Sequence, residues 1–255
     1  MLFNRSIYIG IDPTAGPKAI AYAALDEDLR PMALGQGNLA EVLAFIGGQQ
    51  EALVGVHAPA RLNQGLMADE ERRAGFSPPP TPGRWEDLRL AEYELIRRGL
   101  EIYQTPGKEK PVKGWMRTGF TLHKRLNELG YKAYPDEKSK RLVAEVSPEV
   151  CYRMWLERKP FPKRSLEGRL QRQLALYDLE LDIPDPMRFF EEVTRHRILQ
   201  GELPDEAIYT SGELQGLAIA YTAWKAANRP DEVSLLGDAA EGRILIPAAR
   251  LQEKY

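Results

Sequence analysis

The sequence predicts an α/β fold built around a mixed sheet, and two patterns in its first 60 residues carry that prediction. Apolar runs of strand length, such as residues 6–11, stop at residues that favour turns, beginning with Asp12. After Asn38, in contrast, apolar residues recur at helical spacing until Gly47 ends the segment. Alternating strand and helix patterns of this kind are typical of α/β domains.

The opening elements follow one another in a β-β-β-α-β order. We expect strands at residues 6–11, 18–25, 31–34 and 52–56, with one helix at 39–46. A three-strand meander, a crossover helix and a return strand form the opening of the ribonuclease-H-like fold. In that fold, a carboxylate at the end of the first strand meets a second acidic residue from the neighbouring fourth strand. Asp12 stands in the first of these positions, and His57 stands where the second acid belongs.

The rest of the chain predicts several helices and a few further strands. Residues 60–84 are polar and rich in proline near their end, which predicts an extended surface loop. Ser147 and Pro148 suit the N-cap and the first position of a helix. The further expected helices span residues 85–99, 114–129, 165–179, 187–199 and 211–227, and the further expected strands span 100–103, 141–146 and 243–246. The simplest organisation is one domain over residues 1–255, with an α-rich insertion at about 60–135 over the end of the sheet.

Composition narrows the class of protein. A chain of 255 residues with 43% hydrophobic side chains can bury the core of one large domain. The net charge of −2 gives no global basic field for nucleic acid. The one cysteine, Cys151, allows no internal disulfide and no cysteine pair for structural zinc, and the three histidines lack metal-ligand spacing. No apolar run approaches the roughly 20 residues that cross a bilayer and no leader pattern opens the chain, so we expect a cytoplasmic protein without a membrane partner.

Six segments, in order along nearly the whole chain, resemble one protein family. Their sequences are IGIDPTAG, VGVHAPARL, RLVAEVSPEVCYRMW, RSLEGRLQRQLAL, SGELQGLAIAYTAWKAA and LLGDAAEGRILIP. Together they are similar to the domain-of-unknown-function 429 family, which consists of predicted ribonuclease-H-like nucleases. Each segment alone is a weak signal, and their common order carries the resemblance. It implies a ribonuclease-H-like mixed sheet flanked by helices, and metal-dependent hydrolysis of phosphodiester bonds.

The resemblance also implies a site in which some of the family's acids are replaced. Asp12 and Glu145 keep acids of the family, whereas His57 stands in place of one. Glu213 offers the only carboxylate on its turn of the late helix. The positions of that helix that carry acids in the family are here Ser211, Gly212 and Gln215. The implied catalytic residues are Asp12, His57, Glu145 and Glu213, and the implied metal ligands are Asp12, His57 and Glu145.

Such a site has fewer charges than a two-metal phosphodiesterase needs. Two-metal enzymes use several carboxylates to hold divalent ions roughly 3.5–4 Å apart. Mg²⁺ prefers oxygen ligands, whereas the imidazole of His57 suits Mn²⁺, Zn²⁺ or Fe²⁺ better. The outcomes left open are a single Mg²⁺ or Mn²⁺ ion, a different metal, or none. For a metal site, we expect Asp12, His57 and Glu145 to converge in one crevice beside the sheet.

Two basic stretches bear on the choice of partner. One lies within residues 157–172 and the other within 108–125, where Trp115 and Phe120 are interleaved with the cations. Cations of this kind contact phosphates and aromatic rings stack on bases, so nucleic acid is the expected partner. For either stretch alone, a solvated helix face with buried aromatic rings is the stronger interpretation, and the two stretches together on a chain of net charge −2 favour nucleic acid. The residues expected to bind phosphate or substrate are Lys163, Arg164, Arg169 and Gln215.

Each acidic or imidazole candidate also has a structural interpretation. Asp12 suits a turn after the first strand, His57 suits a buried hydrogen bond, and Glu145 suits an edge strand facing water. Glu149 and Glu213 suit the first turns of their helices, where the helix dipole favours acids. For these two glutamates the structural interpretation is the stronger one.

Three functions are compatible with these observations. The first is a metal-dependent nuclease or phosphodiesterase acting on a nucleic acid or a nucleotide. The second is a catalytically lapsed relative that binds nucleic acid or a protein partner, which the missing acids favour. The third is a phosphotransferase of the actin-like or sugar-kinase type, whose Gly-x-Asp-x-Thr-x-Gly turn loosely resembles residues 10–16. Such kinases duplicate the domain, and this chain is too short for two copies.

Overall fold

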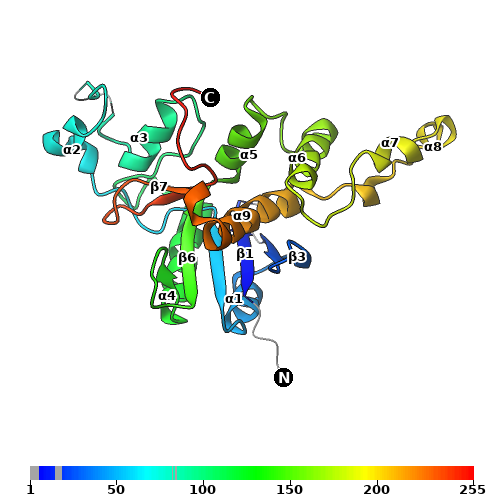
Figure 1. The fold of residues 1–255 in the computed structure, drawn as a ribbon, viewed down its shortest axis with the longest axis horizontal. Helices are drawn as coiled ribbons and strands as arrows, with labels where there is room; N and C mark the ends of the chain where they lie inside the picture. Colours follow the sequence, from blue (N-terminus) through cyan, green and yellow to red (C-terminus); the bar gives the residue numbers. More distant parts are fainter. Residues whose placement is uncertain (1–5, 15–18, 82, 84) are drawn as a thin grey trace.

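An open, mixed sheet of eight strands forms the centre of the described part of the chain (Figure 1). The computed structural model describes residues 6–14, 19–81, 83 and 85–255. The start of the predicted second strand and part of the proline-rich loop, at residues 15–18, 82 and 84, lie outside the described residues. The strands are β1 Ile7–Asp12, β2 Ile20–Leu25, β3 Pro31–Gly37, β4 Ala52–Val56, β5 Lys132–Ala133, β6 Arg141–Val146, β7 Ser234–Leu236 and β8 Ile244–Ile246.

The sheet has the topology that the opening of the sequence predicts. Its strand order is β3-β2-β1-β4-β6-β8-β7, with β5 beside the start of β6. β1, β2 and β3 form the antiparallel meander, and β4, β6 and β8 continue the sheet in parallel from β1. The register aligns Ile11 with Val56, and Val56 with Glu145, so the carboxyl ends of β1, β4 and β6 meet at one edge. This architecture is consistent with the ribonuclease-H-like fold.

Helices cover both faces of the sheet (Figure 1). α9 (Ser211–Asn228) crosses β1, β2 and β4 on one face, and α5 (Pro148–Leu156) and α6 (Leu166–Asp178) pack against it. α1 (Leu39–Gly47) and α4 (Gly114–Glu128) cover the other face. Within the described residues, no helix combines the length and the apolar character that crossing a bilayer requires.

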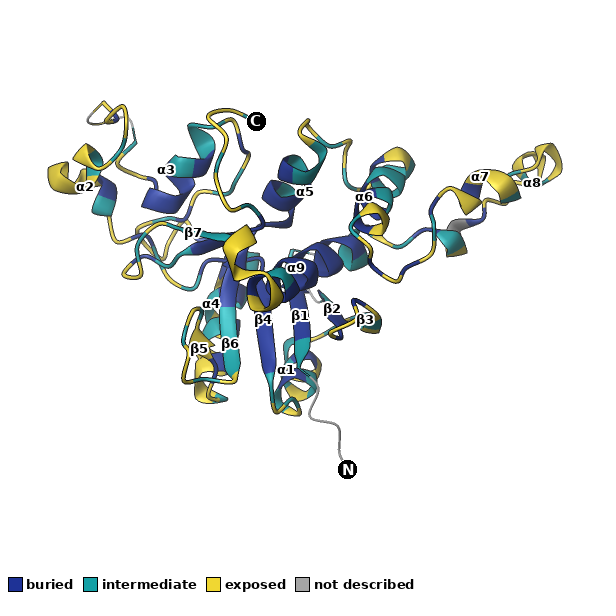
Figure 2. Cartoon of the chain, viewed as in Figure 1, coloured by how far each residue is buried: buried dark blue, intermediate teal, exposed yellow. Residues whose placement is uncertain are grey.

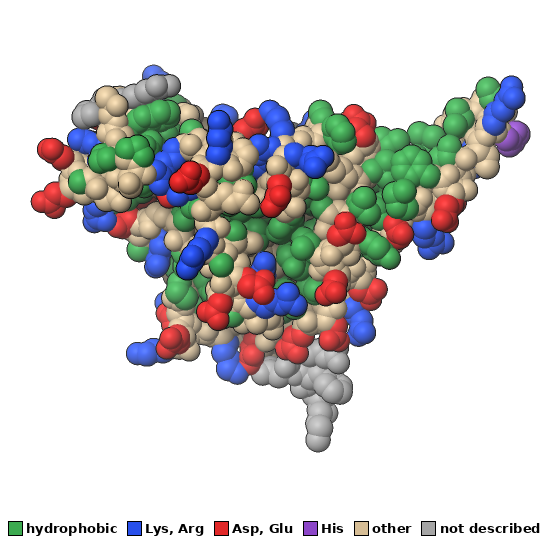
Figure 3. All heavy atoms as spheres, turned by 45° about the horizontal axis from the view of Figure 1, so that its top comes forward, with side chains coloured by type: hydrophobic (Ala, Val, Ile, Leu, Met, Phe, Trp, Pro, Cys, Tyr) green, Lys and Arg blue, Asp and Glu red, His purple; other side chains and the backbone are tan. Residues whose placement is uncertain are grey.

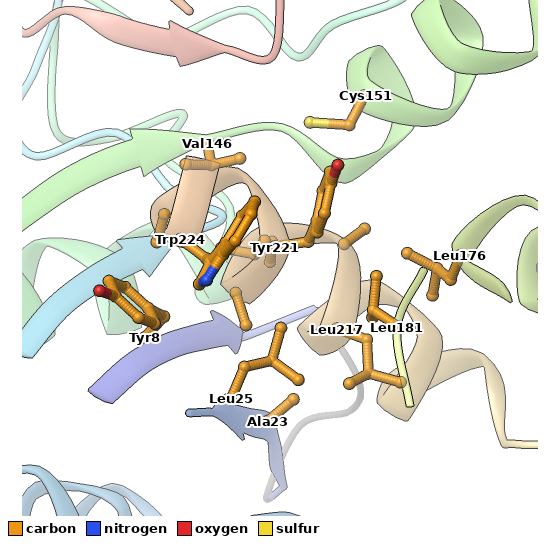
Figure 4. Packing of buried hydrophobic residues seen from close by; sticks show 14 of the residues in the cluster. Tyr8, Ala23, Leu25, Val146, Cys151, Leu176, Leu181, Leu217, Tyr221 and Trp224 are labelled. Carbon is orange, nitrogen blue, oxygen red and sulfur yellow. The ribbon is translucent and has the colours of Figure 1, made fainter. Parts of the chain in front are cut away.

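Much of the core lies between α9 and the sheet, as Figure 4 shows. Tyr221 and Trp224 of α9 belong to the same apolar cluster as Tyr8 of β1. α9 approaches β1 closely because Gly10 has no side chain: a Cβ there would lie 2.0 Å from the carbonyl oxygen of Gly216. Figure 2 shows that α9 and the central strands are largely buried. This close packing fixes the start of α9 relative to the end of β1.

The segment between β4 and β6 holds α2 (Glu70–Ala74), α3 (Leu90–Ile96) and α4. α4 packs on the sheet beside α1, and α3 packs against β7 and β8 at the edge of the sheet. A separate helical insertion at about residues 60–135 stays a prediction.

Some predicted elements differ from the structure for local reasons. The helix predicted at 187–199 is two short helices, α7 (Arg188–Glu192) and α8 (Arg195–Leu199). Thr194 separates them, because its backbone is extended and its hydroxyl caps α8. In Figure 1 both short helices extend away from the body of the molecule. Residues 100–103 form no strand in the described sheet.

Two predicted N-caps are confirmed in position. The side chain of Asn38 accepts hydrogen bonds from the backbone N–H groups of Ala40 and Glu41 at 2.9 and 3.1 Å. Ser147 precedes Pro148 at the start of α5. The side chain of Asn38 therefore caps α1, whereas Ser147 makes no capping hydrogen bond among the described residues and Pro148 at the first helical position marks the start of α5.

Candidate functional site

Asp12 and His57 meet where β1 and β4 end. His57 directly follows β4, and its backbone N–H donates to the carbonyl of Ile11 over 2.9 Å. Both side chains are buried, and His57 Nδ1 lies 3.0 Å from Asp12 Oδ1. Thr14 donates to the same oxygen twice, from its backbone N–H at 2.9 Å and from its hydroxyl at 2.7 Å. Asp12 therefore shapes the turn after β1 and pairs with the predicted site histidine at the same time.

These contacts keep the Asp12 carboxylate ionised. Burial alone would raise the pKa of Asp12, but the hydrogen bond and the charge of His57, together with the hydrogen bonds of Thr14, lower that pKa to about 2. Asp12 is consequently negative at neutral pH. A carboxylate in this state can attract a cation or orient a donor, but it has no proton to give as a general acid.

A pocket of about 210 Å³ opens beside Asp12. Lys163 and Arg164 reach it from the loop before α6. Two side-chain cations therefore share the pocket with one carboxylate, and the pocket suits an anionic group. The described residues that line it are Asp12, Thr14, Gln36, Lys163, Arg164, Thr210, Ser211 and Gly212.

The first turn of α9 forms one wall of this pocket. Ser211 and Gly212 bring backbone N–H groups that have no carbonyl partner within the helix, and the helix dipole adds partial positive charge. Glu213 closes a capping box: its carboxylate accepts hydrogen bonds from the backbone N–H and the hydroxyl of Thr210 at 2.7 and 2.8 Å. A helix start of this kind, combined with nearby cations, is a phosphate-binding arrangement.

Glu145 lies in a different environment, which is a closed and buried network. The two terminal nitrogens of Arg89 lie 2.5 and 2.9 Å from its two carboxylate oxygens. Tyr103 donates its hydroxyl to Glu145 at 2.6 Å, and Arg89 Nε donates to Glu92 at 2.8 Å. Burial alone would lower the pKa of Arg89, but the carboxylates of Glu145 and Glu92 hold that pKa well above its usual range. Glu145 is thus fully engaged by a permanent cation and a hydroxyl.

Asp12 and Glu145 lie on opposite faces of the sheet. Because side chains alternate along a strand, Asp12 shares the α9 face with Tyr8, whereas Glu145 faces the side covered by α1 and α4. His57 links the two regions, since its ring centroid lies 5.6 Å from that of Tyr103. Asp12 and His57 therefore contact each other directly. Glu145 contacts Tyr103, whose ring lies beside the ring of His57.

A second group of ion pairs lies beside the pocket and includes Lys163. Glu149 lies 3.7 Å from Lys163 Nζ and 2.9 Å from a terminal nitrogen of Arg172. Gln215 of α9 donates its amide N–H to Glu149 at 2.6 Å. Burial alone would raise the pKa of Glu149, but the charges of Arg172 and Lys163 lower it. Gln215, expected from the sequence to bind a ligand, thus orients Glu149, which in turn holds Lys163.

The residues at the strand ends do not fit a two-metal centre. Such a centre needs several carboxylates facing the same pair of ions. The oxygens of Glu145 are taken by Arg89 and Tyr103, and Glu213 caps α9. Within the described residues, no group of three or more His, Cys, Asp and Glu side chains is arranged to hold a metal ion. Asp12 and His57 are the two predicted ligands that remain adjacent.

The structure brings some predicted site residues together and separates others. Asp12, Lys163 and Arg164 line one pocket, with His57 beside Asp12. Arg169 lies further along α6, at its fourth residue. Glu145, Glu213 and Gln215 have the partners described above.

Sequence reasoning missed the partners that decide the state of the two acids. Arg89 and Tyr103 bind Glu145 from 56 and 42 residues away, and no local pattern marks them. Thr14 is different, because a Thr two residues after a turn Asp commonly hydrogen-bonds to it. That signal was present in the sequence.

The fold and the pocket define the class of protein: a mixed α/β domain with a positively charged pocket at the carboxyl end of β1. The chain matches the family model described as "Protein of unknown function (DUF429)" over residues 10–241, and it belongs to that family. The family expected from the six sequence segments is therefore confirmed. Neither the curated proteins nor the solved structures contain a match to the chain.

Proposed function

We propose that the protein binds a phosphate-bearing ligand, a nucleic acid or a nucleotide, in the pocket beside Asp12. The convergence of Lys163, Arg164 and the first turn of α9 on one cavity of about 210 Å³ carries this proposal. Side-chain cations and the N–H groups at a helix start are the groups that bind phosphate oxygens. The two cations outnumber the single carboxylate of Asp12 among the described lining residues, so an anion is favoured.

In this proposal, the protein has a ribonuclease-H-like fold and binds the phosphate-bearing ligand without hydrolysing it. Arg89 neutralises Glu145, and Glu213 stabilises the start of α9. Asp12 then has a positioning role, because its bonds with Thr14 and His57 hold the turn that forms one wall of the pocket.

A metal-dependent nuclease or phosphodiesterase is the second candidate, and one observation favours it. The ionised carboxylate of Asp12 lies 3.0 Å from His57 at the wall of a pocket that suits phosphate. A carboxylate and an imidazole are both metal-ligand types, suited to Mn²⁺ in combination. This candidate keeps the chemistry that the family resemblance implies.

A cytoplasmic location is part of the proposal. Cys151 is the one cysteine of the chain, so it has no intramolecular disulfide partner. It is also buried, and burial raises the pKa of its thiol to about 12. A protein with an unreactive thiol and no internal disulfide suits a reducing compartment such as the cytoplasm, where nucleic acids are also found.

Fluorescence anisotropy with a labelled single-stranded oligonucleotide tests the binding function. Arg164→Ala should weaken binding about tenfold, and should reduce the slope of log K against log salt by about 0.7, because one phosphate contact is lost. Lys132→Ala is the matched control, since it removes an equal charge away from the pocket. Lys132 belongs to β5, which pairs with the start of β6, whereas the pocket lies at the carboxyl end of β1. This control should change the affinity less than about twofold. Equal affinities of the wild type and Arg164→Ala would contradict the proposal.

A cleavage assay with Mn²⁺ and with Mg²⁺ separates the two candidates. A binding protein should leave labelled DNA and RNA intact at protein concentrations that saturate binding. A nuclease should cut one of them, and Asp12→Asn should abolish the cutting because the carboxylate is lost. Metal-dependent cleavage that disappears in Asp12→Asn would contradict the binding-only function and support the nuclease.

A further inference from the structure

A larger pocket adjoins the Asp12 pocket and shares Lys163 with it. Its volume is about 390 Å³, and α5, α6 and the loop between them contribute to its lining. Figure 3 shows Lys and Arg side chains, with acidic ones among them, on the face that carries α3, α5 and α6. The charged residues in the described lining are the cations Arg153, Lys159, Lys163 and Arg172 and the acids Glu101 and Glu149.

The cations of this pocket are only partly neutralised. Glu101 pairs with Lys159, and Glu149 is shared between Lys163 and Arg172. Arg172 is only 2% exposed, and its Nε has no hydrogen-bond partner among the described residues. Arg153 forms no ion pair in the described part of the chain. The pocket therefore keeps positive charge that an anionic ligand can satisfy.

Phe161 gives the pocket an aromatic wall. Phe161 is 53% exposed, whereas hydrogen bonds fix its backbone at both the N–H and the carbonyl. Its N–H donates to Gln171 at 2.8 Å, and its carbonyl accepts from Arg172 at 2.8 Å. The loop also packs tightly on α6, because a Cβ at Gly168 would lie 1.9 Å from the carbonyl oxygen of Pro162. An exposed ring on a fixed backbone, beside cations, is a platform on which unpaired bases stack.

We propose that this second pocket binds the adjoining nucleotide of a single-stranded nucleic acid whose neighbouring phosphate occupies the Asp12 pocket. Lys163 lies at the boundary and contacts the backbone between the two nucleotides. Arg153 contacts the second phosphate, and the base stacks on Phe161. This inference rests on the proposed function and narrows its ligand to a strand longer than one nucleotide. A duplex fits the platform less well, because its bases are stacked on one another and only the terminal pairs present a free face.

Two ligands of different length test this inference on the full chain. Thymidine 5′-monophosphate reports on the Asp12 pocket, and a thymidine hexanucleotide reports on both pockets. The wild type should bind the hexanucleotide at least about tenfold more tightly than the monophosphate, and more tightly than a DNA duplex that is long enough to stay paired. A uridine hexanucleotide in parallel shows whether the strand is DNA or RNA.

Variants of the second pocket should affect only the longer ligand. Arg153→Ala and Phe161→Ala should each weaken hexanucleotide binding about tenfold and leave monophosphate binding within about twofold. Phe161→Trp should keep the affinity, because its ring still stacks. Lys132→Ala is the control for the loss of one charge, and thermal unfolding verifies that the variants are folded.

Arg164→Ala separates this inference from the proposed function. It should weaken both ligands, because Arg164 lines the Asp12 pocket and not the second one. If it does so while Arg153→Ala and Phe161→Ala change neither ligand, the second pocket is not a nucleotide site and the Asp12 pocket stands. If Arg164→Ala changes neither ligand, the proposed function falls, and this inference falls with it.

Discussion

The acids at the ends of β1 and β6 occupy opposite environments. Asp12 lies at the wall of an open pocket, where Thr14 and His57 contact one of its oxygens. Glu145 lies in a closed network, where Arg89 binds both of its oxygens and Tyr103 binds one. A carboxylate at a strand end can therefore belong to a site or to the core, and its partners decide which.

The same comparison explains why Asp12 and Glu145 do not face a common site among the described residues at this edge. A guanidinium is a permanent cation with a fixed fork of donors, so it satisfies a buried carboxylate without a metal. Arg89 does this for Glu145 and, through its Nε, for Glu92. Asp12 is ionised and lies beside the pocket. Glu145 instead has a structural role, because Arg89 and Tyr103 bind its carboxylate.

Arg89→Ala should have the largest effect, because it leaves two buried carboxylates without their cation. We expect the free energy of unfolding at pH 7 to fall by about 3–5 kcal/mol, measured by urea denaturation. Arg125→Ala is the control: Arg125 forms an exposed pair with Glu128, and its loss should cost less than about 1 kcal/mol. A similar small loss for Arg89→Ala would show that the environment of Glu145 is not closed.

Asp12 should give a smaller effect that depends on pH. Its folded-state pKa of about 2 lies below the ordinary value of 3.8, so ionisation of Asp12 stabilises the fold. This contribution, about 2 kcal/mol in full, is present above pH ~5 and is lost progressively as the pH falls toward 2. The difference in free energy of unfolding between the wild type and Asp12→Asn should therefore shrink by about 1 kcal/mol from pH 6 to pH 3. A difference that stays constant over this range would mean that His57 and Thr14 do not lower the pKa.

Glu213 should give the smallest effect and tests whether it belongs to the site or to the helix. Glu213→Ala removes half of the capping box with Thr210 and should cost about 1 kcal/mol of stability. Glu213→Gln should be nearly neutral, because a glutamine side chain also closes the box. Oligonucleotide binding, measured by anisotropy, should be unchanged in Glu213→Gln. Loss of binding in that variant would place the charge of Glu213 in the site.

Much of the fold could be predicted because its signals are local. The apolar runs of β1, β2 and β4, and the side chain of Asn38 at the start of α1, depend on neighbours in the sequence. The prediction at residues 187–199 was wrong in one respect, because Thr194 interrupts the helix by capping a new one. Apolar spacing alone continues through such a break.

The candidate site could be predicted only in part. Asp12 follows from the end of β1, and Lys163 and Arg164 follow from their charge. Their placement beside the first turn of α9 follows from tertiary packing, in which Gly10 lets α9 approach the sheet.

By itself, the sequence determined the strand that ends at Asp12, the family, and the basic side chains near α6. These features could be predicted because turns, caps and charge are properties of short segments. Only the tertiary structure decided that Asp12 faces a pocket while Glu145 is closed by Arg89. Those outcomes depend on which face of the sheet each side chain occupies, and on partners as far as 56 residues away that packing alone brings into contact.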